Sequence, residues 1–312
     1  MLNESNSLPT IAVLRGGAGT KQSLEEGVDI LRSLSHIGYV PLDVLVSESG
    51  EWTLHGLPTD AHYVFTLAEI VVDTTRTRNA PYQKLAKEMG VSLLFSHDDT
   101  VSFDRETMYR LLRQQGISTP KTHLIRASAP VTPVALKTIW HTFHTPLMVR
   151  PVNKGQGASA LIRKFKDLEM VLQEYQNADV DAHILTYRDT PTTSVAVLPQ
   201  FRGQKIYTSL PLETFPPKGS LPRTDHPMRG HAQALHDKKE AMIRAAHDAY
   251  NALGLSTHAC IDMIPHKEGY MVVNIDTTPS LHKESRFVRA LEATGVDIGQ
   301  YVHAQTAYDG AR

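Results

Sequence analysis

The chain has 312 residues, 41% hydrophobic and 21% charged, a composition typical of a globular protein with a large buried core. Its formal net charge of −1 excludes a strong overall attraction to nucleic acid or to an anionic membrane. The single cysteine, Cys260, excludes an internal disulfide, and with no long apolar run and no leader pattern at the start we expect a cytoplasmic protein without a membrane span or signal peptide.

Residues 1–98 predict a small α/β unit. Residues 10–20 predict a buried strand that ends in a glycine-rich turn, and residues 23–39 predict an amphipathic helix that ends at Gly38. A strand at 40–47 would complete a β-α-β opening, which is typical of a parallel sheet. Further expected elements are strands at 61–70 and 92–96 and a helix at 80–91.

A second region begins near residue 100. Asp104 is expected to cap a helix whose apolar residues, Met108 among them, point inward. Residues 145–165 predict a strand, a glycine-rich loop and a strand, which together form a hairpin-like flap. The other expected elements are a helix at 166–178, strands at 183–189, 193–199 and 204–215, a long polar loop at 216–230, a helix at 237–253, strands at 258–266 and 269–276, and a mostly helical C-terminal segment.

Polar residues lie at the ends of the last two predicted strands. Asn274 and Asp276 are two residues apart, which places both side chains on one face of a strand, and Asp262 lies in the antiparallel neighbour. Two carboxylates and an amide are oxygen donors that Mg²⁺ accepts together with phosphate oxygens and water. The same three residues also suit an ordinary polar strand end, so the spacing alone leaves both interpretations open.

The flap is a candidate phosphate-binding segment. Gly155 and Gly157 would let backbone N–H groups approach a phosphate closely. Arg150 and Lys154 would add positive charge. An ordinary tight turn uses the same residues.

A second glycine-rich turn follows the first predicted strand. Gly16 and Gly17 would bring a ligand to a helix N-terminus, which favours anions. The residues after them do not match the GxGxxG dinucleotide fingerprint, and a plain strand-to-helix turn explains the pattern equally well.

The order of these motifs resembles the D-alanine–D-alanine ligases of the ATP-grasp superfamily, over nearly the whole chain. "IAVLRGG" resembles the family's first strand, and "FDRETMYRLLRQQGISTP" resembles the segment that opens its central domain. "PLMVRPVNKGQGAS" is similar to its flap strand and loop, and "AHDAYNALGLSTHACIDMI" to the helix and strand that carry a metal-binding aspartate. "VVNIDTTPSLHKES" resembles the family pattern E-x-N-T-x-P-G-x-x-x-x-S.

The resemblance implies an α/β fold of the ATP-grasp type. The implied domains are an N-terminal α/β domain (1–98), a central ATP-grasp subdomain with the flap (99–182) and a C-terminal ATP-grasp subdomain with the metal site (183–312). The implied activity is an ATP- and Mg²⁺-dependent ligation of two D-alanines through an acyl phosphate, for peptidoglycan precursor synthesis. Small-molecule substrates and a homodimer are implied, with no nucleic acid and no membrane as partner.

Residue by residue, the resemblance implies three sets of functional groups. The implied metal ligands are Asp262, Asn274 and Asp276. The implied nucleotide-binding set is Arg105, Arg150, Lys154, Gly155, Gly157, Thr186 and Tyr187, where both arginines replace lysines of the family and Thr186 replaces its adenine-reading glutamate. The implied catalytic set is Lys218 of the closing loop, Ser285 for the carboxylate of the second D-alanine, and the turn glycines Gly16 and Gly17.

Several positions depart from the family pattern. Cys260 stands where the family has an arginine that stabilises the oxyanion, and a thiol carries no positive charge. Lys21 stands near the place of a glutamate that holds the first D-alanine's amine. The metal ligands run Asp, Asn, Asp instead of Asp, Glu, Asn, which supports one Mg²⁺ more easily than two. Four interpretations stay open: a weakened D-alanine–D-alanine ligase, a ligase for another acid or amine, which the basic residues Lys21, Arg76 and Arg78 would suit, a pseudoenzyme that only binds, and an unrelated α/β binding protein.

Overall fold

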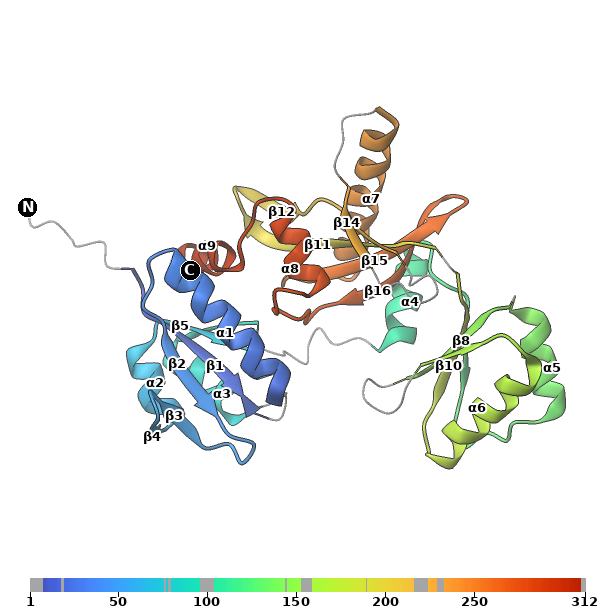
Figure 1. Cartoon of the computed structure of the whole chain (residues 1–312), viewed down its shortest axis with the longest axis horizontal. Helices are drawn as coiled ribbons and strands as arrows, with labels where there is room; N and C mark the ends of the chain where they lie inside the picture. Colours follow the sequence, from blue (N-terminus) through green and yellow to red (C-terminus); the bar gives the residue numbers. More distant parts are fainter. Residues whose placement is uncertain are drawn as a thin grey trace, which may run out of the picture.

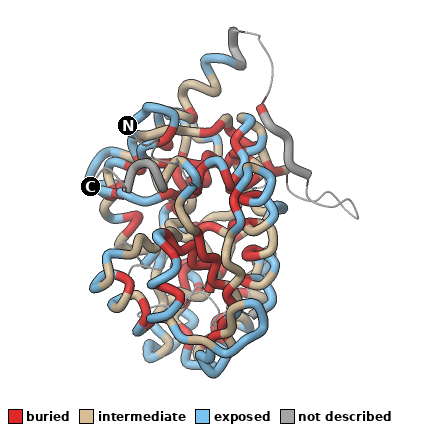
Figure 2. Tube along the Cα trace, turned by 90° about the vertical axis from the view of Figure 1, so that its left-hand side faces the viewer, coloured by how far each residue is buried: buried red, intermediate tan, exposed pale blue. Residues whose placement is uncertain are grey.

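The computed structural model describes residues 8–17, 20–75, 77, 80–95, 104–143, 145–152, 159–188, 190–215, 224–228 and 233–309. These residues form three β-sheets with flanking helices, and Figure 1 shows one lobe on each side of a central sheet. None of the helices in these ranges has the length and hydropathy that a membrane span requires. Figure 2 shows buried residues running through the interior of the chain, with exposed residues outside them.

The N-terminal sheet has the strand order β4-β3-β2-β1-β5-β6. Strand β1 pairs in parallel with β2 and β5, so the predicted β-α-β opening is confirmed. The strands are β1 (Ile11–Gly16), β2 (Leu42–Val46), β3 (Trp52–Leu54), β4 (Leu57–Thr59), β5 (Ile70–Asp73) and β6 (Ser92–Leu94). The helices of this unit are α1 (Thr20–His36), α2 (Ala61–Leu67) and α3 (Pro81–Met89).

The predicted strand at 61–70 is wrong, because most of this segment is helix α2. The Asp60 side chain accepts a hydrogen bond from the backbone N–H of Tyr63, and this cap starts the helix. Val64 and Phe65 are buried on its inner face. Strand β5 begins only at Ile70.

The second sheet is antiparallel and has the order β7-β10-β8-β9. Its strands are β7 (Thr122–Ile125), β8 (Leu147–Pro151), β9 (Ala160–Ile162) and β10 (Ala182–Thr186). Helices α5 (Pro133–Thr142) and α6 (Phe165–Asn177) pack on it around a shared apolar core. The predicted hairpin strands β8 and β9 are present, and β7 and α5 were not predicted. Helix α4 (Arg105–Gln114) precedes this sheet, and Asp104 caps it as predicted.

The central sheet has the order β14-β13-β11-β15-β16, and β12 pairs with β11. Its strands are β11 (Thr192–Phe201), β12 (Gln204–Thr208), β13 (Leu212–Phe215), β14 (Thr224–Pro227), β15 (Ala259–His266) and β16 (Gly269–Asp276). The single strand predicted at 204–215 is therefore two strands. The segment 216–230, predicted to be all loop, contains β14, which pairs with β13.

Helices cover both faces of the central sheet. Helix α7 (Gln233–Ala252) packs on the face that carries Val195 and Val197 of β11. Helices α8 (Arg286–Glu292) and α9 (Ile298–Asp309) belong to the core on the opposite face, with Ala196 and Leu198. This second core continues into the N-terminal unit, and the boundaries assigned to the three domains stay a prediction.

Candidate functional site

The four polar residues Cys260, Asp262, Asn274 and Asp276 lie side by side on β15 and β16. In the strand register Asp262 pairs with Asn274, and Cys260 pairs with Asp276. An irregularity after Asp262 shifts the register by one residue, so that Met263 pairs with Val272 and Val273 is the extra residue of a bulge. All four side chains line a cavity of about 370 Å³. The other lining residues are Pro279, Ser280, Glu284, Ser285, Arg286 and Phe287.

Asp262 is buried and charge-compensated within the chain. Its Oδ1 accepts a hydrogen bond from Ser194 Oγ at 2.6 Å, and its Oδ2 lies 3.1 Å from Arg286 Nη1. Asn274 Nδ2 lies 3.4 Å from the same Oδ2. Burial raises the pKa of Asp262, and the Arg286 guanidinium is the largest of the influences that oppose this rise.

Arg286 was not identified in the sequence. It follows Ser285 at the start of α8, and its contact with Asp262 depends on the path of the turn at 277–285, which no spacing rule predicts. Cys260 is buried, and burial raises the pKa of its thiol well above the ordinary value, so it is neutral at pH 7. The guanidinium that the sequence lacks at position 260 is thus present in the same cavity, from a different element.

The carboxylate and amide oxygens near the ends of β15 and β16 have the chemistry of ligands for one divalent cation. The three predicted metal ligands are together, but Asp262 already neutralises Arg286. Asp276 accepts a hydrogen bond from the backbone N–H of Thr278 at 3.3 Å through one of its two carboxylate oxygens. Within the described ranges no group of three or more His, Cys, Asp and Glu side chains has metal-binding geometry, so a cation here depends on the Asn274 amide as well.

Arg105 and Arg150 lie close enough to repel each other. Burial lowers the pKa of Arg150, and the positive charge of Arg105 lowers it further. Both arginines also act on the buried Tyr109, and Asp262 attracts Arg150. Arg105 Nε is buried without a hydrogen-bond partner. Two like charges and an unsatisfied donor are the arrangement that a bound anion would stabilise.

A second cavity of about 370 Å³ brings together Arg150, Thr186, Tyr187 and Thr192. Thr186 ends β10 and Thr192 begins β11, so the cavity lies at the connection between the second sheet and the central sheet. Its apolar walls include Leu185, Ile264, Met271 and Val273. A slot with apolar walls that is also lined by the cationic side chains of Lys121, Arg150 and Arg188 suits a flat ring that carries an anionic tail.

The remaining predicted site residues divide into two groups. Ser285 lines the first cavity, and its Oγ also caps α8 by accepting from the backbone N–H of Val288 at 3.1 Å. Gly16 and Gly17 have φ values of +97° and +68°. A Cβ atom on Gly16 would lie 2.3 Å from the carbonyl oxygen of Val46, so strand packing alone requires this glycine. The predicted residues Lys154, Gly155, Gly157 and Lys218 lie outside the described residues.

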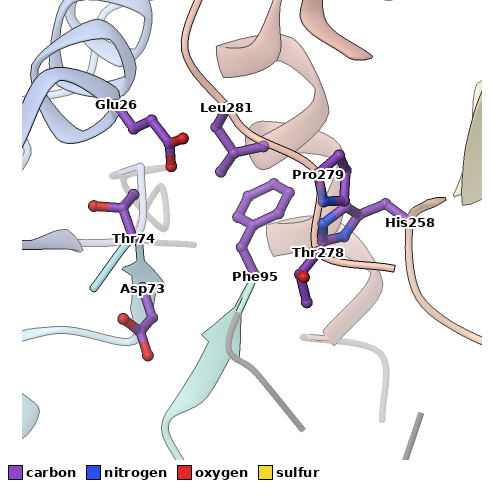
Figure 3. A pocket seen from close by; sticks show the side chains of 8 residues that line it. All are labelled: Glu26, Asp73, Thr74, Phe95, His258, Thr278, Pro279 and Leu281. Carbon is purple, nitrogen blue, oxygen red and sulfur yellow. The ribbon is translucent and has the colours of Figure 1, made fainter. Parts of the chain in front are cut away.

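A small third cavity lies where the N-terminal unit meets the turn at 277–281, as Figure 3 shows. It has a volume of about 10 Å³, room for one water molecule. Glu26 on α1 lines it and accepts hydrogen bonds from Ser280 Oγ at 2.5 Å and Gln22 Nε2 at 3.0 Å. The side chain of Lys21, one turn earlier, is 89% exposed and pairs with Glu25 at 3.8 Å. The buried acid of α1 is therefore Glu26, which was not identified in the sequence.

Comparisons with known proteins agree with this architecture. The family described as "D-ala D-ala ligase C-terminus" matches residues 111–305, more than half of the chain. A D-alanine–D-alanine ligase of Methylacidiphilum infernorum is 22% identical over 306 residues, which covers 93% of this chain and 92% of that protein.

Two solved structures share the fold over almost the whole length. The D-alanine–D-alanine ligase of Coxiella burnetii has a TM-score of 0.73 at 16% identity, covering 97% of this chain and 95% of that one. The D-alanine–D-alanine ligase of Bacillus anthracis complexed with ATP has a TM-score of 0.72 at 14% identity, covering 96% and 97%. The α/β fold of the ATP-grasp type is thereby confirmed, and the chain belongs to the D-alanine–D-alanine ligase family.

Proposed function

We propose that this protein is an ATP-dependent carboxylate–amine ligase that joins two D-alanines. The observation that carries the proposal is the pair Arg105 and Arg150, which repel each other beside the second cavity while Asp262 attracts Arg150. Two guanidinium groups held close together repel each other, and a bound anion would offset this repulsion. The triphosphate of a nucleotide is the anion that fits, because it would extend from the slot toward the first cavity.

The adenine and the phosphates of the nucleotide would lie in different parts of the site. The adenine would occupy the slot beside Thr186 and Tyr187, and the phosphates would contact Arg150 and Arg105. A solved relative with the same fold is described as complexed with ATP, which supports a nucleotide site on this scaffold. Mg²⁺ would be held from Asn274 and Asp276, where it would neutralise phosphate oxygens. The predicted contacts of Lys154, Gly155 and Gly157 with the phosphates belong to the same proposal.

The chain's own residues act mainly by positioning and by neutralising charge. In the proposed reaction one D-alanine carboxylate takes the γ-phosphoryl group and ADP leaves, and the amine of the second D-alanine then displaces phosphate to form the amide bond. Ser285 would hold the carboxylate of the second D-alanine in the first cavity. Lys218 would close over the substrates, and the Gly16–Gly17 turn would border the first D-alanine.

The proposed reaction also has consequences for the pathway, the compartment and the oligomeric state of the protein. We infer that the dipeptide serves peptidoglycan precursor synthesis in the cytoplasm, and that the protein acts as a homodimer on small-molecule substrates. Light scattering after gel filtration tests the dimer, which predicts twice the mass of the 34.6 kDa chain.

A ligase for a different acid or amine is the second candidate. The observation that favours it is the placement of Lys21, which is exposed and paired with Glu25, while Glu26 is buried against Ser280. The acid that would face a substrate amine thus differs from the family pattern.

Release of ADP from ATP and Mg²⁺, measured with a panel of D- and L-amino acids, tests both candidates. We expect stimulation by D-alanine, loss of activity in Asp262→Asn, and no change in Arg244→Gln, which alters an exposed ion pair on α7. Stimulation by another amino acid alone would favour the second candidate. ATP binding without stimulation by any amino acid would contradict both and favour a pseudoenzyme.

A further inference from the structure

We propose that Arg286 is the resident cation of Asp262: its guanidinium takes the place that a divalent ion would otherwise occupy at this carboxylate. The site would then take one divalent cation together with the nucleotide, and not two. The part of this inference that concerns nucleotide rests on the proposed function, whereas the part that concerns metal alone does not.

The contacts of Asp262 support this assignment. Both carboxylate oxygens are engaged, Oδ1 by Ser194 at 2.6 Å and Oδ2 by Arg286 at 3.1 Å. The Asp262 side chain is only 6% exposed, whereas the Arg286 side chain is 36% exposed and lines the cavity. A buried carboxylate of this kind needs a positive partner, and Arg286 supplies it from α8.

The charge balance of the cavity favours a single metal ion. The lining acids are Asp262, Asp276 and Glu284, and Arg286 is the cationic side chain among the lining residues. A divalent ion bound to Asp262 would have to displace the guanidinium, and two cations would then compete for one buried carboxylate. Asn274 directs its Nδ2 toward Asp262, so its Oδ1 is the atom of this side chain that would ligate a single ion together with Asp276.

Arginine also brings properties that a metal ion lacks. The guanidinium is permanently charged and offers several N–H donors in a plane, so it can hold Asp262 and still donate to an oxyanion in the cavity. A fixed cation from α8 would therefore stabilise negative charge on the reacting oxygens, from the side that a second metal ion would otherwise occupy.

Binding of Mn²⁺ to the full-length chain, followed by the electron paramagnetic resonance of free Mn²⁺, tests the proposal without measuring catalysis. In the first arm Mn²⁺ is added alone. We expect Arg286→Gln to bind Mn²⁺ at least about tenfold more tightly than the wild type, because the released carboxylate becomes a metal ligand. Arg286→Lys keeps a cation and should resemble the wild type, as should Arg289→Gln, which changes an arginine one turn later on the same helix. The double variant Asp262→Asn/Arg286→Gln should lose the gained affinity.

In the second arm a non-hydrolysable ATP analogue is present. The wild type should bind one Mn²⁺ per chain and Arg286→Gln should bind two. Two Mn²⁺ in the wild type would overturn the proposal without any variant, and so would an unchanged affinity of folded Arg286→Gln for Mn²⁺ alone. A wild type that binds no nucleotide, with the gain in the first arm intact, would refute the proposed function and leave the role of Arg286 standing.

Discussion

At the scale of single residues, the arginine pair of the proposed nucleotide site places binding and stability in opposition. Burial and the positive charge of Arg105 lower the pKa of Arg150, so both disfavour the charged guanidinium in the folded chain. Arg105 Nε adds a buried donor without an acceptor. An unfavourable arrangement of charges in the free protein is typical of a site where a bound ligand relieves it. These two side chains therefore indicate a binding site more clearly than a satisfied ion pair would.

Replacing Arg150 with glutamine should separate these two effects. We expect ATP affinity to fall about tenfold to a hundredfold, because a charged hydrogen bond to phosphate is lost. The free energy of unfolding should stay unchanged or rise, because the repulsion from Arg105 disappears. Calorimetric titration with ATP and thermal unfolding measure the two quantities. As a control, Arg126→Gln removes an exposed pair with Asp181 and should leave ATP affinity unchanged; unchanged affinity in Arg150→Gln would contradict the site.

Asp73 should make stability depend on pH in the mildly acidic range. Its carboxylate is buried, and burial raises its pKa above the ordinary value of 3.8 despite hydrogen bonds from Thr75 and Tyr82. Because the folded pKa is the higher one, the stability that Asp73 contributes is fully present below about pH 3.8 and is lost as the pH rises through the folded pKa. Asp73→Asn should flatten this limb, because the amide does not titrate in this range. Urea unfolding between pH 4 and 7 measures it, and an equally steep limb in the variant would contradict the assignment.

At the scale of elements, the bulge in β16 determines which side chains of β15 and β16 lie opposite each other in the site. Because Val273 is the extra residue, Asn274 lies opposite Asp262, and Asp276 lies opposite Cys260. The Val273 carbonyl accepts a hydrogen bond from Tyr109 Oη at 2.6 Å, which ties the bulge to α4. Arg105 is on the same helix, so one contact connects the arginine pair with the strand that carries Asn274 and Asp276.

Removing the Tyr109 hydroxyl should therefore affect activity as well as stability. Tyr109→Phe leaves a carbonyl at the bulge without this donor, and we expect a loss of about 1–2 kcal/mol in the free energy of unfolding. Tyr250→Phe is a matched control, because Tyr250 is also buried and donates to the Thr257 carbonyl at 2.7 Å at the far end of α7. Both variants should lose similar stability, but only Tyr109→Phe should lower the rate of ADP release. Equal rates in the two variants would argue against a role of the bulge.

Sequence patterns predicted elements with strong local signals and failed where distant contacts decide. The Asp104 cap and the apolar spacing of α4 and the apolar spacing of α6 were sufficient, and period-2 spacing placed Asn274 and Asp276 on one face. The segment 61–70 was misassigned because its apolar residues suit a strand as well as a helix, and the Asp60 cap was overlooked. The contact between Arg286 and Asp262 was beyond prediction, because it joins elements through a turn whose path no local propensity fixes.

At the scale of the whole molecule, the C-terminal helices hold the N-terminal unit against the central sheet. Helix α9 packs along α1, and Figure 1 shows these two helices side by side. Ser33 on α1 hydrogen-bonds with Asp297 and accepts from the backbone N–H of Gly299 at 2.9 Å. Tyr39 Oη lies 2.6 Å from His303 Nδ1 further along the same contact. The helix α8 that carries Arg286 is thus followed by a helix anchored in a different unit, so this contact bears on the geometry of the cavity beside Asp262.

Gly299 permits the close approach of these two helices, and adding one methyl group should disturb it. A Cβ atom at Gly299 would lie 2.7 Å from Ser33 Oγ and 2.8 Å from the Ser33 carbonyl oxygen. Alanine favours a helix by about 1 kcal/mol over glycine, but overpacking costs about 1–3 kcal/mol, so we expect Gly299→Ala to lose about 1–2 kcal/mol of unfolding free energy in urea. Ser33→Ala should not rescue it, because the backbone carbonyl stays in place. Gln300→Glu, at the adjacent exposed position, keeps the acceptor for the Asp297 backbone N–H and should change stability by less than about 0.5 kcal/mol. A Gly299→Ala chain as stable as the wild type would mean that α9 can move away from α1 without cost, and the contact would then not fix the position of α8.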